Sequence, residues 1–308
     1  MLARQFLEIA PITRHPNAVE VNPSLSINSQ ALQPVLHLDA LGNDRFAANT
    51  LSPNMGGAIF GGQYLANVVG AAMLTADAHH PHMMQAFFLR AGDLQSPLEY
   101  SVQRVREGRR FAHRRVEVHQ QERLLMTADV SLYTGGNAGH LHQRTMPVLP
   151  PPEQLDTLEV LLERHRTEIS DDIRERVLRK QAVLVKPVDP TASIFHKAKQ
   201  AQLAIWLKTA QTMPATRYYR YCALTYLADY WLGAVSTALY ADSIFSPAHA
   251  VLSLNHSLWF HTEPMLDDWL LYALDSPNAG RGLGLGHGAF YDRRGTLLAT
   301  AMQEALQL

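Results

Sequence analysis

The stretch Thr225–Tyr240, TYLADYWLGAVSTALY, carries the strongest single signal in the chain. Its apolar residues recur at three- and four-residue spacings, which predicts one buried helix over the whole stretch. Asp229 lies in the middle of this apolar pattern. Ionised carboxylates are rarely buried without a partner, because desolvation penalises the charged form. Asp229 is therefore either held in a structural ion pair or hydrogen bond, or used in chemistry.

Composition narrows the class of protein. The chain has 308 residues and 47% hydrophobic content, enough for one large core or two domains. Its 27 basic and 28 acidic residues give a net charge of −1, so nothing indicates a nucleic-acid partner. The single cysteine excludes an internal disulfide and fits a reducing compartment. Without a membrane-length apolar run, a signal peptide or a peroxisomal address, we expect a cytoplasmic protein.

Four segments are expected along the chain. Residues 1–35 form an N-terminal extension without a sustained period, and 36–135 form a first domain. Residues 136–180 form a proline-rich linker with connecting helices, and 181–308 form a second domain. In the first domain, a glycine-rich turn at 56–62 precedes an apolar helix and four antiparallel strands. The turn lacks the Lys-Ser/Thr of a phosphate-binding loop, so its glycines predict close backbone packing.

The second domain repeats the first at an offset of 172 residues, or 173 near the C-terminus. The matched pairs are Phe88 and Phe260, Leu94 and Leu266, Leu98 and Leu270, Tyr100 and Tyr272, Gly108 and Gly280, Leu125 and Leu298, and Ala128 and Ala301. The same comparison aligns a helix from Gln63 onward with a helix from Asp229 onward. A repeated helix followed by antiparallel strands predicts an α+β protein built as two copies of one unit.

Eight motifs in one order give a more specific indication. They are FGGQYLANVVGAA, QAFFLRAGD, VQRVREGRRFAHRRVEVHQ, QRTMP, LADYW, SLNHSLWFH, DDWLLYALDSPNAGRG and GAFYDRRGTLLATAMQEAL. Together they resemble the acyl-CoA thioesterase II family, from about residue 40 to the C-terminus. The resemblance implies a tandem double hot-dog fold, in which each long helix is wrapped by an antiparallel sheet. It also implies hydrolysis of fatty acyl-CoA to free fatty acid and coenzyme A, without a cofactor or metal, by a homo-oligomer.

The resemblance also implies which residues act. Members of this family hold the attacking water with an Asp, a Ser or Thr, and a Gln. By motif these are Asp229 of LADYW, Ser253 of SLNHS and Gln303 of AMQEAL. Two positions differ from many bacterial members, which have Asp-His where this chain has Asn255-His256, and His where it has Gln85. The second difference is expected to alter substrate binding in the first half.

The chemistry of this trio is simple. Asp229 would accept the proton of the water, and burial in an apolar helix is expected to raise its pKa from about 3.9. Ser253 and Gln303 would orient the water by hydrogen bonds. At the matched positions of the first half stand Pro81 and Val130, which have neither a hydroxyl nor an amide. One working site and one degenerate copy are therefore expected.

Other chemical features have simpler explanations. Cys222 has no evident base, so a buried structural thiol is expected. The run His79-His80-Pro81-His82 matches no metal-ligand spacing and is interpreted as a surface loop. Arginines between 104 and 115 either line solvated strand faces or meet coenzyme A phosphates. Glycines at alternate positions from 282 to 288 let another backbone approach one strand face.

Two other functions stay open. A hot-dog dehydratase would need a catalytic His beside the carboxylate, and no His lies at a matching place. A non-catalytic acyl-CoA-binding protein would share the fold without the chemistry. Release of free thiol from palmitoyl-CoA separates a thioesterase from both.

Overall fold

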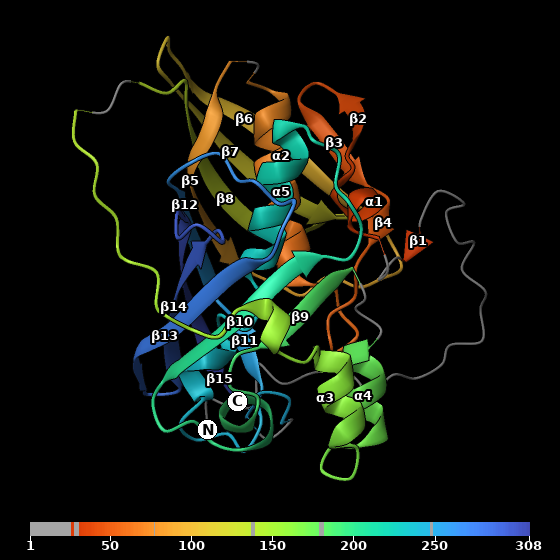
Figure 1. Ribbon diagram of the computed structural model, residues 1–308. Coiled ribbons are helices and arrows are strands. Elements are labelled where there is room, and N and C mark those ends of the chain that lie inside the picture. Colours follow the sequence, from red (N-terminus) through yellow and green to blue (C-terminus); the bar gives the residue numbers. More distant parts are fainter. Residues whose placement is uncertain (1–25, 28–30, 77, 137–138, 179–181, 247–248) are drawn as a thin grey trace, which may run out of the picture.

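A computed structural model describes residues 26–27, 31–76, 78–136, 139–178, 182–246 and 249–308 (Figure 1). Most of the expected extension 1–35 lies outside these residues. The helices are α1 (Leu32–Leu36), α2 (Gly61–Leu74), α3 (Leu158–Arg164), α4 (Asp171–Leu178) and α5 (Arg217–Ala228). Short turns of other helix types occupy η1 (Pro152–Gln154), η2 (Thr191–Phe195) and η3 (Ala234–Thr237).

One 13-stranded sheet dominates the structure, and its neighbouring strands all pair antiparallel. The first half contributes β2 (Asp39–Gly42), β3 (Arg45–Ala48), β5 (His80–Phe88), β6 (Leu98–Glu107), β7 (Phe111–Gln120) and β8 (Arg123–Tyr133). The second contributes β9 (Val183–Pro187), β10 (Gln202–Thr209), β11 (Val251–Ser253), β12 (Asn255–Phe260), β13 (Leu270–Gly280), β14 (Leu283–Tyr291) and β15 (Leu297–Gln307). Separately, β1 (Ser26–Ile27) pairs parallel with β4 (Thr50–Leu51).

The two halves join where β5 pairs with β12. The strand order from one edge to the other is β2-β3-β6-β7-β8-β5-β12-β15-β14-β13-β10-β9, with β11 beside β15. Figure 1 shows α2 and α5 side by side, with the sheet curving around them. The expected α+β architecture, two helix-and-sheet units sharing one long antiparallel sheet, is confirmed.

The strand register supports the repeat residue by residue. Phe88 pairs with Met126 in the first half, and Phe260 pairs with Ala299 in the second, at offsets of 172 and 173. The same offsets relate the pair Pro81 and Leu132 to the pair Ser253 and Ala305. The sequence offset therefore identifies structurally equivalent positions in the sheet.

Glycines bring the two central helices into close contact. A Cβ atom built on Gly62 would lie 2.5 Å from the Tyr226 carbonyl oxygen, and one on Gly70 would lie 3.1 Å from the Cys222 sulfur. The start of α2 thus meets the end of α5, so the helices run antiparallel. The prediction of close backbone packing around the glycine-rich turn agrees with this contact at Gly62.

The predicted helix Thr225–Tyr240 is wrong in its bounds. Helix α5 begins at Arg217 and ends at Ala228, so Asp229 is its C-cap rather than a mid-helix residue. The Tyr272 hydroxyl donates to the Ala228 carbonyl at 2.8 Å, and Trp231 takes the left-handed backbone conformation at φ 60°. A left-handed residue ends a helix, so the helix cannot continue past Trp231. The apolar period of the sequence continues there because the following segment is also buried in the core.

The alignment of the two helices from Gln63 and Asp229 is also wrong. The helix of the second half precedes Asp229, whereas the helix of the first half follows Gly61. These two regions are spatial neighbours rather than equivalents, because a Cβ on Gly61 would lie 2.6 Å from Asp229 Oδ2. The strands obey the repeat offset, but the segments that enter and leave the helices do not.

The outer face of the second-half sheet carries a small hydrophobic core of its own. Trp206, Leu271 and Tyr291 are buried there against Met146 and Leu149 of the linker. The Trp206 indole N–H donates to the Pro150 carbonyl at 3.0 Å. In Figure 1 the yellow-green linker passes along the outer side before it reaches α3 and α4. The proline-rich segment is thus partly a cover for this face.

Candidate active site

Two of the three predicted site residues meet directly. Gln303 of β15 is 2% exposed, and its Nε2 donates to the Ser253 hydroxyl oxygen at 2.7 Å. Ser253 ends β11, which pairs with β15 so that Ser253 lies opposite Ala305. Both side chains point to the sheet face that packs against α5 and η3, because Gly233 approaches the Gln303 amide from that side. The sheet thus holds the hydroxyl and the amide in register.

A third polar residue extends this pair. His256 of β12 is fully buried, and its Nδ1 lies 2.8 Å from Gln303 Oε1. Burial lowers the pKa of His256 to about 4, so the ring is neutral at ordinary pH. The result is a continuous hydrogen-bonded chain from His256 through Gln303 to Ser253.

Asp229 lies at the junction of the two helices. Its carboxylate lies against Gly61, the first residue of α2, where an added Cβ would be 2.6 Å from Asp229 Oδ2 and 3.3 Å from the Phe88 ring. The Phe88 N–H donates to the carbonyl of Leu254, which directly follows Ser253. The positive end of the α2 dipole favours a negative charge at this place. The expectation of a carboxylate buried in the middle of a helix is wrong. Asp229 is partly exposed and lies at the end of α5.

The charge of Asp229 also acts on nearby tyrosines. Burial, and then the Asp229 carboxylate, raises the pKa of Tyr272 well above its usual value. Burial, then the neighbouring Tyr226, and then Asp229 raise the pKa of Tyr230. Burial and Asp229 raise the pKa of Tyr226 to about 12, although hydrogen bonds with Ser52 and Tyr230 act to lower it. These phenols therefore stay protonated, and Tyr272 keeps its donor on Ala228.

The segment that follows Asp229 connects the end of α5 to a contact with Gln303. A Cβ on Gly233 would lie 3.1 Å from Gln303 Nε2, and one on Gly286 would lie 2.0 Å from the Leu232 carbonyl oxygen. A side chain at Gly286 would displace this backbone. The prediction that alternate glycines admit a close backbone is confirmed at Gly286 alone. Side chains, of Ser236 and Tyr272, approach Gly284 and Gly288, and Gly282 lies in the preceding turn at φ 78°.

The first half holds apolar side chains at the equivalent places. Val130 pairs with Met84 in the register where Gln303 lies beside His256, and both Val130 and Met84 are fully buried. Pro81 stands at the position of Ser253. The polar chain is therefore confined to the second half, as the sequence comparison predicted for Ser253 and Gln303.

Gln63 and Gln85 lie outside this hydrogen-bonded chain. Gln63 is fully buried, accepts from the Ser52 N–H and donates to the Thr50 carbonyl, so it ties the loop before α2 to the helix. Gln85 is exposed and lies opposite Ser257 on the outer sheet face. The expectation that Gln85 alters substrate binding in the first half has no support from this position, because its neighbours Met84 and Ala86 face the core instead.

The basic stretch is mostly engaged in structural contacts. Arg114 is fully buried, donates to the Thr75 carbonyl at the end of α2 and pairs with Glu107 at 2.6 Å. Exposed Arg104 and Arg115 pair with Asp44 and Asp129. Arg114 therefore caps α2 and is removed as a candidate contact for phosphates.

The remaining candidates agree with structural roles. Cys222 is fully buried beside Tyr218, and burial raises the pKa of its thiol. The histidine run belongs largely to β5 rather than to a loop, with His79 bonded to the Gly108 carbonyl. Within the described ranges no group of three or more His, Cys, Asp or Glu could hold a metal ion.

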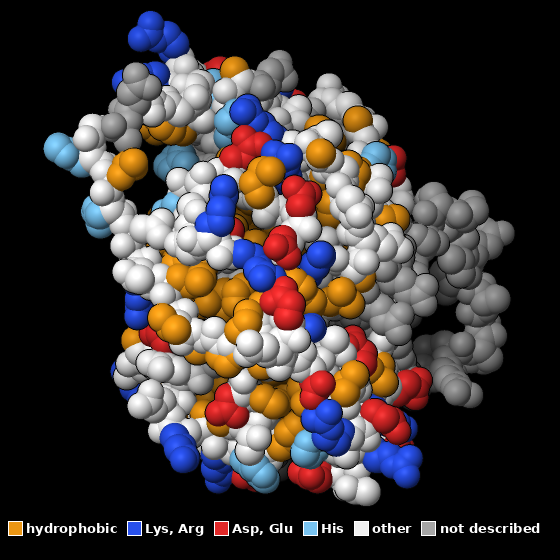
Figure 2. All heavy atoms as spheres, viewed as in Figure 1, with side chains coloured by type: hydrophobic (Ala, Val, Ile, Leu, Met, Phe, Trp, Pro, Cys, Tyr) orange, Lys and Arg blue, Asp and Glu red, His pale blue; other side chains and the backbone are white. Residues whose placement is uncertain are grey.

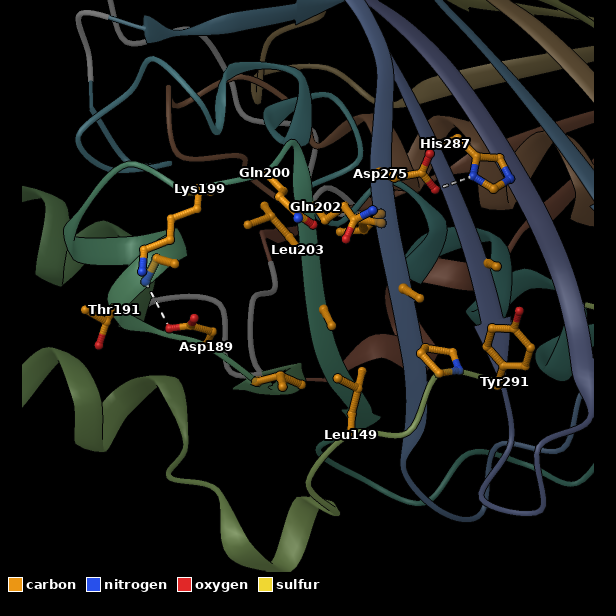
Figure 3. A pocket seen from close by; sticks show the side chains of 18 of the residues that line it. Leu149, Asp189, Thr191, Lys199, Gln200, Gln202, Leu203, Asp275, His287 and Tyr291 are labelled. Atoms are coloured by element: carbon orange, nitrogen blue, oxygen red, sulfur yellow. Dashed lines mark hydrogen bonds and ion pairs between the residues drawn. The ribbon is translucent and has the colours of Figure 1, made fainter. Parts of the chain in front are cut away.

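A cavity of about 840 Å³ lies on the opposite face of the sheet. Figure 3 shows Asp275 and His287 on neighbouring strands at one side, with Lys199 and Thr191 across from them. Asp275 Oδ1 lies 2.8 Å from His287 Nδ1, within hydrogen-bonding distance. Ala289 and Tyr291 also line it, and they alternate with the core-facing residues of β14. Its size alone does not make it the active site, because Ser253 and Gln303 face the other way.

Charges on the visible surface are mixed. Figure 2 shows Lys and Arg interspersed with Asp and Glu on this face, in keeping with the net charge of −1. In the described part of the chain, no helix is long and apolar enough to cross a membrane.

Comparison with known families decides the classification. Residues 152–307 match the family described as the acyl-CoA thioesterase C-terminal domain, and residues 51–133 match its N-terminal domain. The chain belongs to the acyl-CoA thioesterase family. The resemblance seen in the eight motifs is thereby confirmed.

Relatives of this acyl-CoA thioesterase family member match most of its length. It is 28% identical to human acyl-coenzyme A thioesterase 8, covering 92% of this chain and 91% of that one. It is 29% identical to acyl-CoA thioesterase 2 of Haemophilus influenzae, covering 80% and 87%. The solved acyl-CoA thioesterase II TesB2 of Mycobacterium marinum aligns with a TM-score of 0.72 at 29% identity, covering 90% and 98%.

A second solved relative is the tesB protein of Mycobacterium avium subs paratuberculosis, with a TM-score of 0.73 at 26% identity, covering 89% and 97%. A further neighbour titled with the hot-dog fold, from Alicyclobacillus acidocaldarius, has a TM-score of 0.72 at 17% identity and supports the fold alone. The tandem double hot-dog architecture is therefore confirmed for this family member.

The motif comparison found Ser253 and Gln303 but gave His256 no role. Its signal was present, since His256 stands in the quoted SLNHSLWFH and follows a strand position whose alternation places it toward the core. A His on a buried strand face needs a hydrogen-bond partner. The partner, Gln303, is 47 residues away and is identified only by the strand pairing.

Proposed function

We propose that this thioesterase hydrolyses fatty acyl-CoA to free fatty acid and coenzyme A through a water held by Asp229, Ser253 and Gln303. The observation that carries the proposal is the hydrogen bond from Gln303 Nε2 to Ser253 Oγ at 2.7 Å in a family of this name. The two motifs that supply these residues are 50 positions apart in the chain.

The chemical step needs no covalent enzyme intermediate. Asp229 takes a proton from the water while the water oxygen bonds to the thioester carbonyl carbon. The carbon–sulfur bond then breaks, and the coenzyme A thiolate takes up the proton from Asp229. Ser253 accepts a hydrogen bond from Gln303, so its own proton can be donated to the water oxygen.

The neighbourhood of Asp229 supports its role as the base. The carboxylate lies at the amino end of α2, whose first N–H groups have no acceptor within the helix. Gly61 leaves room for this carboxylate, and the segment from Asp229 to Gly233 leads directly to the Gln303 amide. The convergence of all three side chains on one water stays part of the proposal.

A thiol-release assay tests the function. The purified protein should release free thiol from palmitoyl-CoA, and a series of acyl-CoA chain lengths should define its preference. A dehydratase or a non-catalytic acyl-CoA-binding protein would release none. Lack of thiol release at every chain length, from a protein that binds acyl-CoA in calorimetry, would favour the binding protein.

Three further expectations accompany the proposal. We propose a cytoplasmic homo-oligomer, for which light scattering should give a mass above the 34.4 kDa of one chain. The domain limits near residues 35, 135 and 180 stay predictions. Limited proteolysis should cut first near these limits if they are correct.

A further inference from the structure

His256 occupies an unusual position for a buried polar residue. Its Nδ1 is bonded to Gln303, whereas within the described residues its Nε2 has no hydrogen-bond partner. A buried polar atom without a partner costs about 1–3 kcal/mol. The side chain is fully buried, so solvent does not relieve this cost. His256 therefore needs a reason beyond filling space.

Two proton arrangements are compatible with the heavy atoms. In the first, His256 Nδ1–H donates to Gln303 Oε1, and Gln303 Nε2 donates to Ser253. In the second, the amide is turned over, its nitrogen donates to Nδ1, and its oxygen accepts the Ser253 proton. The second arrangement puts the ring proton on Nε2, and so buries an N–H without an acceptor.

The first arrangement costs less. It leaves only a lone pair unpaired on Nε2, and orphaned buried N–H groups are rarer than under-satisfied acceptors. The first arrangement fixes the donor and acceptor of each hydrogen bond from His256 through Gln303 to Ser253. Ser253 accepts from Gln303 and keeps its own proton for another acceptor. In the second arrangement, the Ser253 hydroxyl proton would be donated to the Gln303 amide oxygen.

The first half provides an internal comparison. At the places equivalent to His256 and Gln303, it has Met84 and Val130, both fully buried and paired in the same register. The fold thus accommodates two apolar side chains at this point of the sheet. A buried His and Gln are not required for folding, and their presence in the second half indicates a role in the site.

We propose that His256 is a positioning residue whose Nδ1–H holds the Gln303 amide in the orientation that leaves the Ser253 hydroxyl proton for the attacking water. The inference rests on the proposed hydrolysis and adds a residue to it. His256 acts through Gln303 and does not touch the substrate.

Two substitutions separate positioning from packing. His256→Asn keeps an N–H donor near the place of Nδ1, whereas His256→Met copies the first half and removes the donor. We expect His256→Met to lower kcat about 10- to 100-fold with little change in KM, the range for loss of an orienting partner. His256→Asn should recover much of the loss. Met84→Leu, at the equivalent place of the first half, is the matched control and should leave kcat unchanged.

A spectroscopic measurement is independent of activity. Nitrogen NMR of the histidine rings at pH 7 should show a proton on His256 Nδ1 and none on Nε2 in the wild-type protein. Gln303→Ala should change the His256 signals but not those of His261, whose Nε2 is bonded to Thr300 at 2.8 Å.

The possible outcomes are distinct. A proton on His256 Nε2 overturns the inference, as does a folded His256→Met protein with wild-type kcat. Equal losses in His256→Asn and His256→Met, with unchanged melting temperatures, also overturn it. If the wild-type protein releases no thiol, the hydrolytic function fails, and the ring-nitrogen spectrum still supports or overturns the hydrogen-bond direction.

Discussion

Single residues of this protein take their chemistry from distant parts of the chain. Asp229 follows α5 of the second half, yet its carboxylate lies against Gly61 at the start of α2 in the first half. Ser253 and Gln303 belong to different strands, and β11 and β15 bring them together. Removing one side chain should therefore test one role at a time, provided that the fold persists.

The carboxylate of Asp229 is the first such test. Asp229→Asn keeps the size and polarity of the side chain but removes the base, so turnover should fall by about 10²–10⁴-fold. Thiol release at saturating acyl-CoA measures this, and circular dichroism checks the fold. A variant with near-wild-type turnover would show that the carboxylate has a structural role.

The histidine of the polar chain predicts a pH effect on stability. Burial lowers the pKa of folded His256 to about 4, from an ordinary value of 6.5. Between these pH values the unfolded chain binds a proton that the folded chain does not, so His256 makes the protein less stable as pH falls. The loss is on the order of 3 kcal/mol.

Urea unfolding of wild type and His256→Met measures this loss. The wild-type protein should lose more stability than the variant as pH falls from 6.5 to 4, because only the wild type carries the depressed pKa. Parallel dependence on pH in the two proteins would contradict a neutral buried ring.

Among the elements, the irregular segment after α5 has the tightest contacts. The Leu232 carbonyl lies so close to Gly286 of β14 that a Cβ there would be 2.0 Å from its oxygen. Gly284 makes a similar approach to Ser236 of η3. Strand β14 thus provides a surface without side chains against which the segment from Leu232 to Ser236 packs.

Substitution of Gly286 should therefore disturb both stability and activity. Gly286→Ala should destabilise the fold by about 1–3 kcal/mol through overpacking and lower turnover, because it displaces the segment that carries Asp229. Thermal unfolding and thiol release measure the two effects. Gly280→Ala is the control, since nothing lies within 4 Å of the Cβ it would add. Equal behaviour of the two variants would argue against this contact.

At the scale of the whole molecule, duplication built a symmetric sheet with an asymmetric site. The equivalent positions of the first half contain Pro81, Met84 and Val130 in place of Ser253, His256 and Gln303. The first half still contributes the amino end of α2, against which Asp229 lies. One site per chain, built from both halves, is the expected result.

This asymmetry predicts how substitutions combine. Ser253→Ala and Gln303→Ala should each slow thiol release, and together they should cost less than the sum of their separate free energies, since both hold one water. Val130→Ala, the first-half match of Gln303→Ala, should affect stability without this coupling. Strict additivity of Ser253→Ala and Gln303→Ala would separate the two residues mechanistically.

The sequence alone determined the strands, the duplication and the family. Patterns between turns predicted four antiparallel strands after the first helix, and the structure has β5, β6, β7 and β8 there, because strands follow local periodicity and turn residues. The constant offset identified Pro81 and Val130 as the first-half equivalents of Ser253 and Gln303, because strand register preserves sequence spacing. Ordered motifs supplied the candidate residues.

Only the tertiary structure decided where α5 ends and what surrounds Asp229. The apolar period continued past Ala228 because both the helix and the turn after it are buried, so burial alone could not mark the boundary. That boundary depends on Tyr272 and Gly286, which lie more than 40 residues further along the chain. The role of His256 likewise depends on Gln303, 47 residues away, because a hydrogen bond between strands is set by their pairing and not by local sequence.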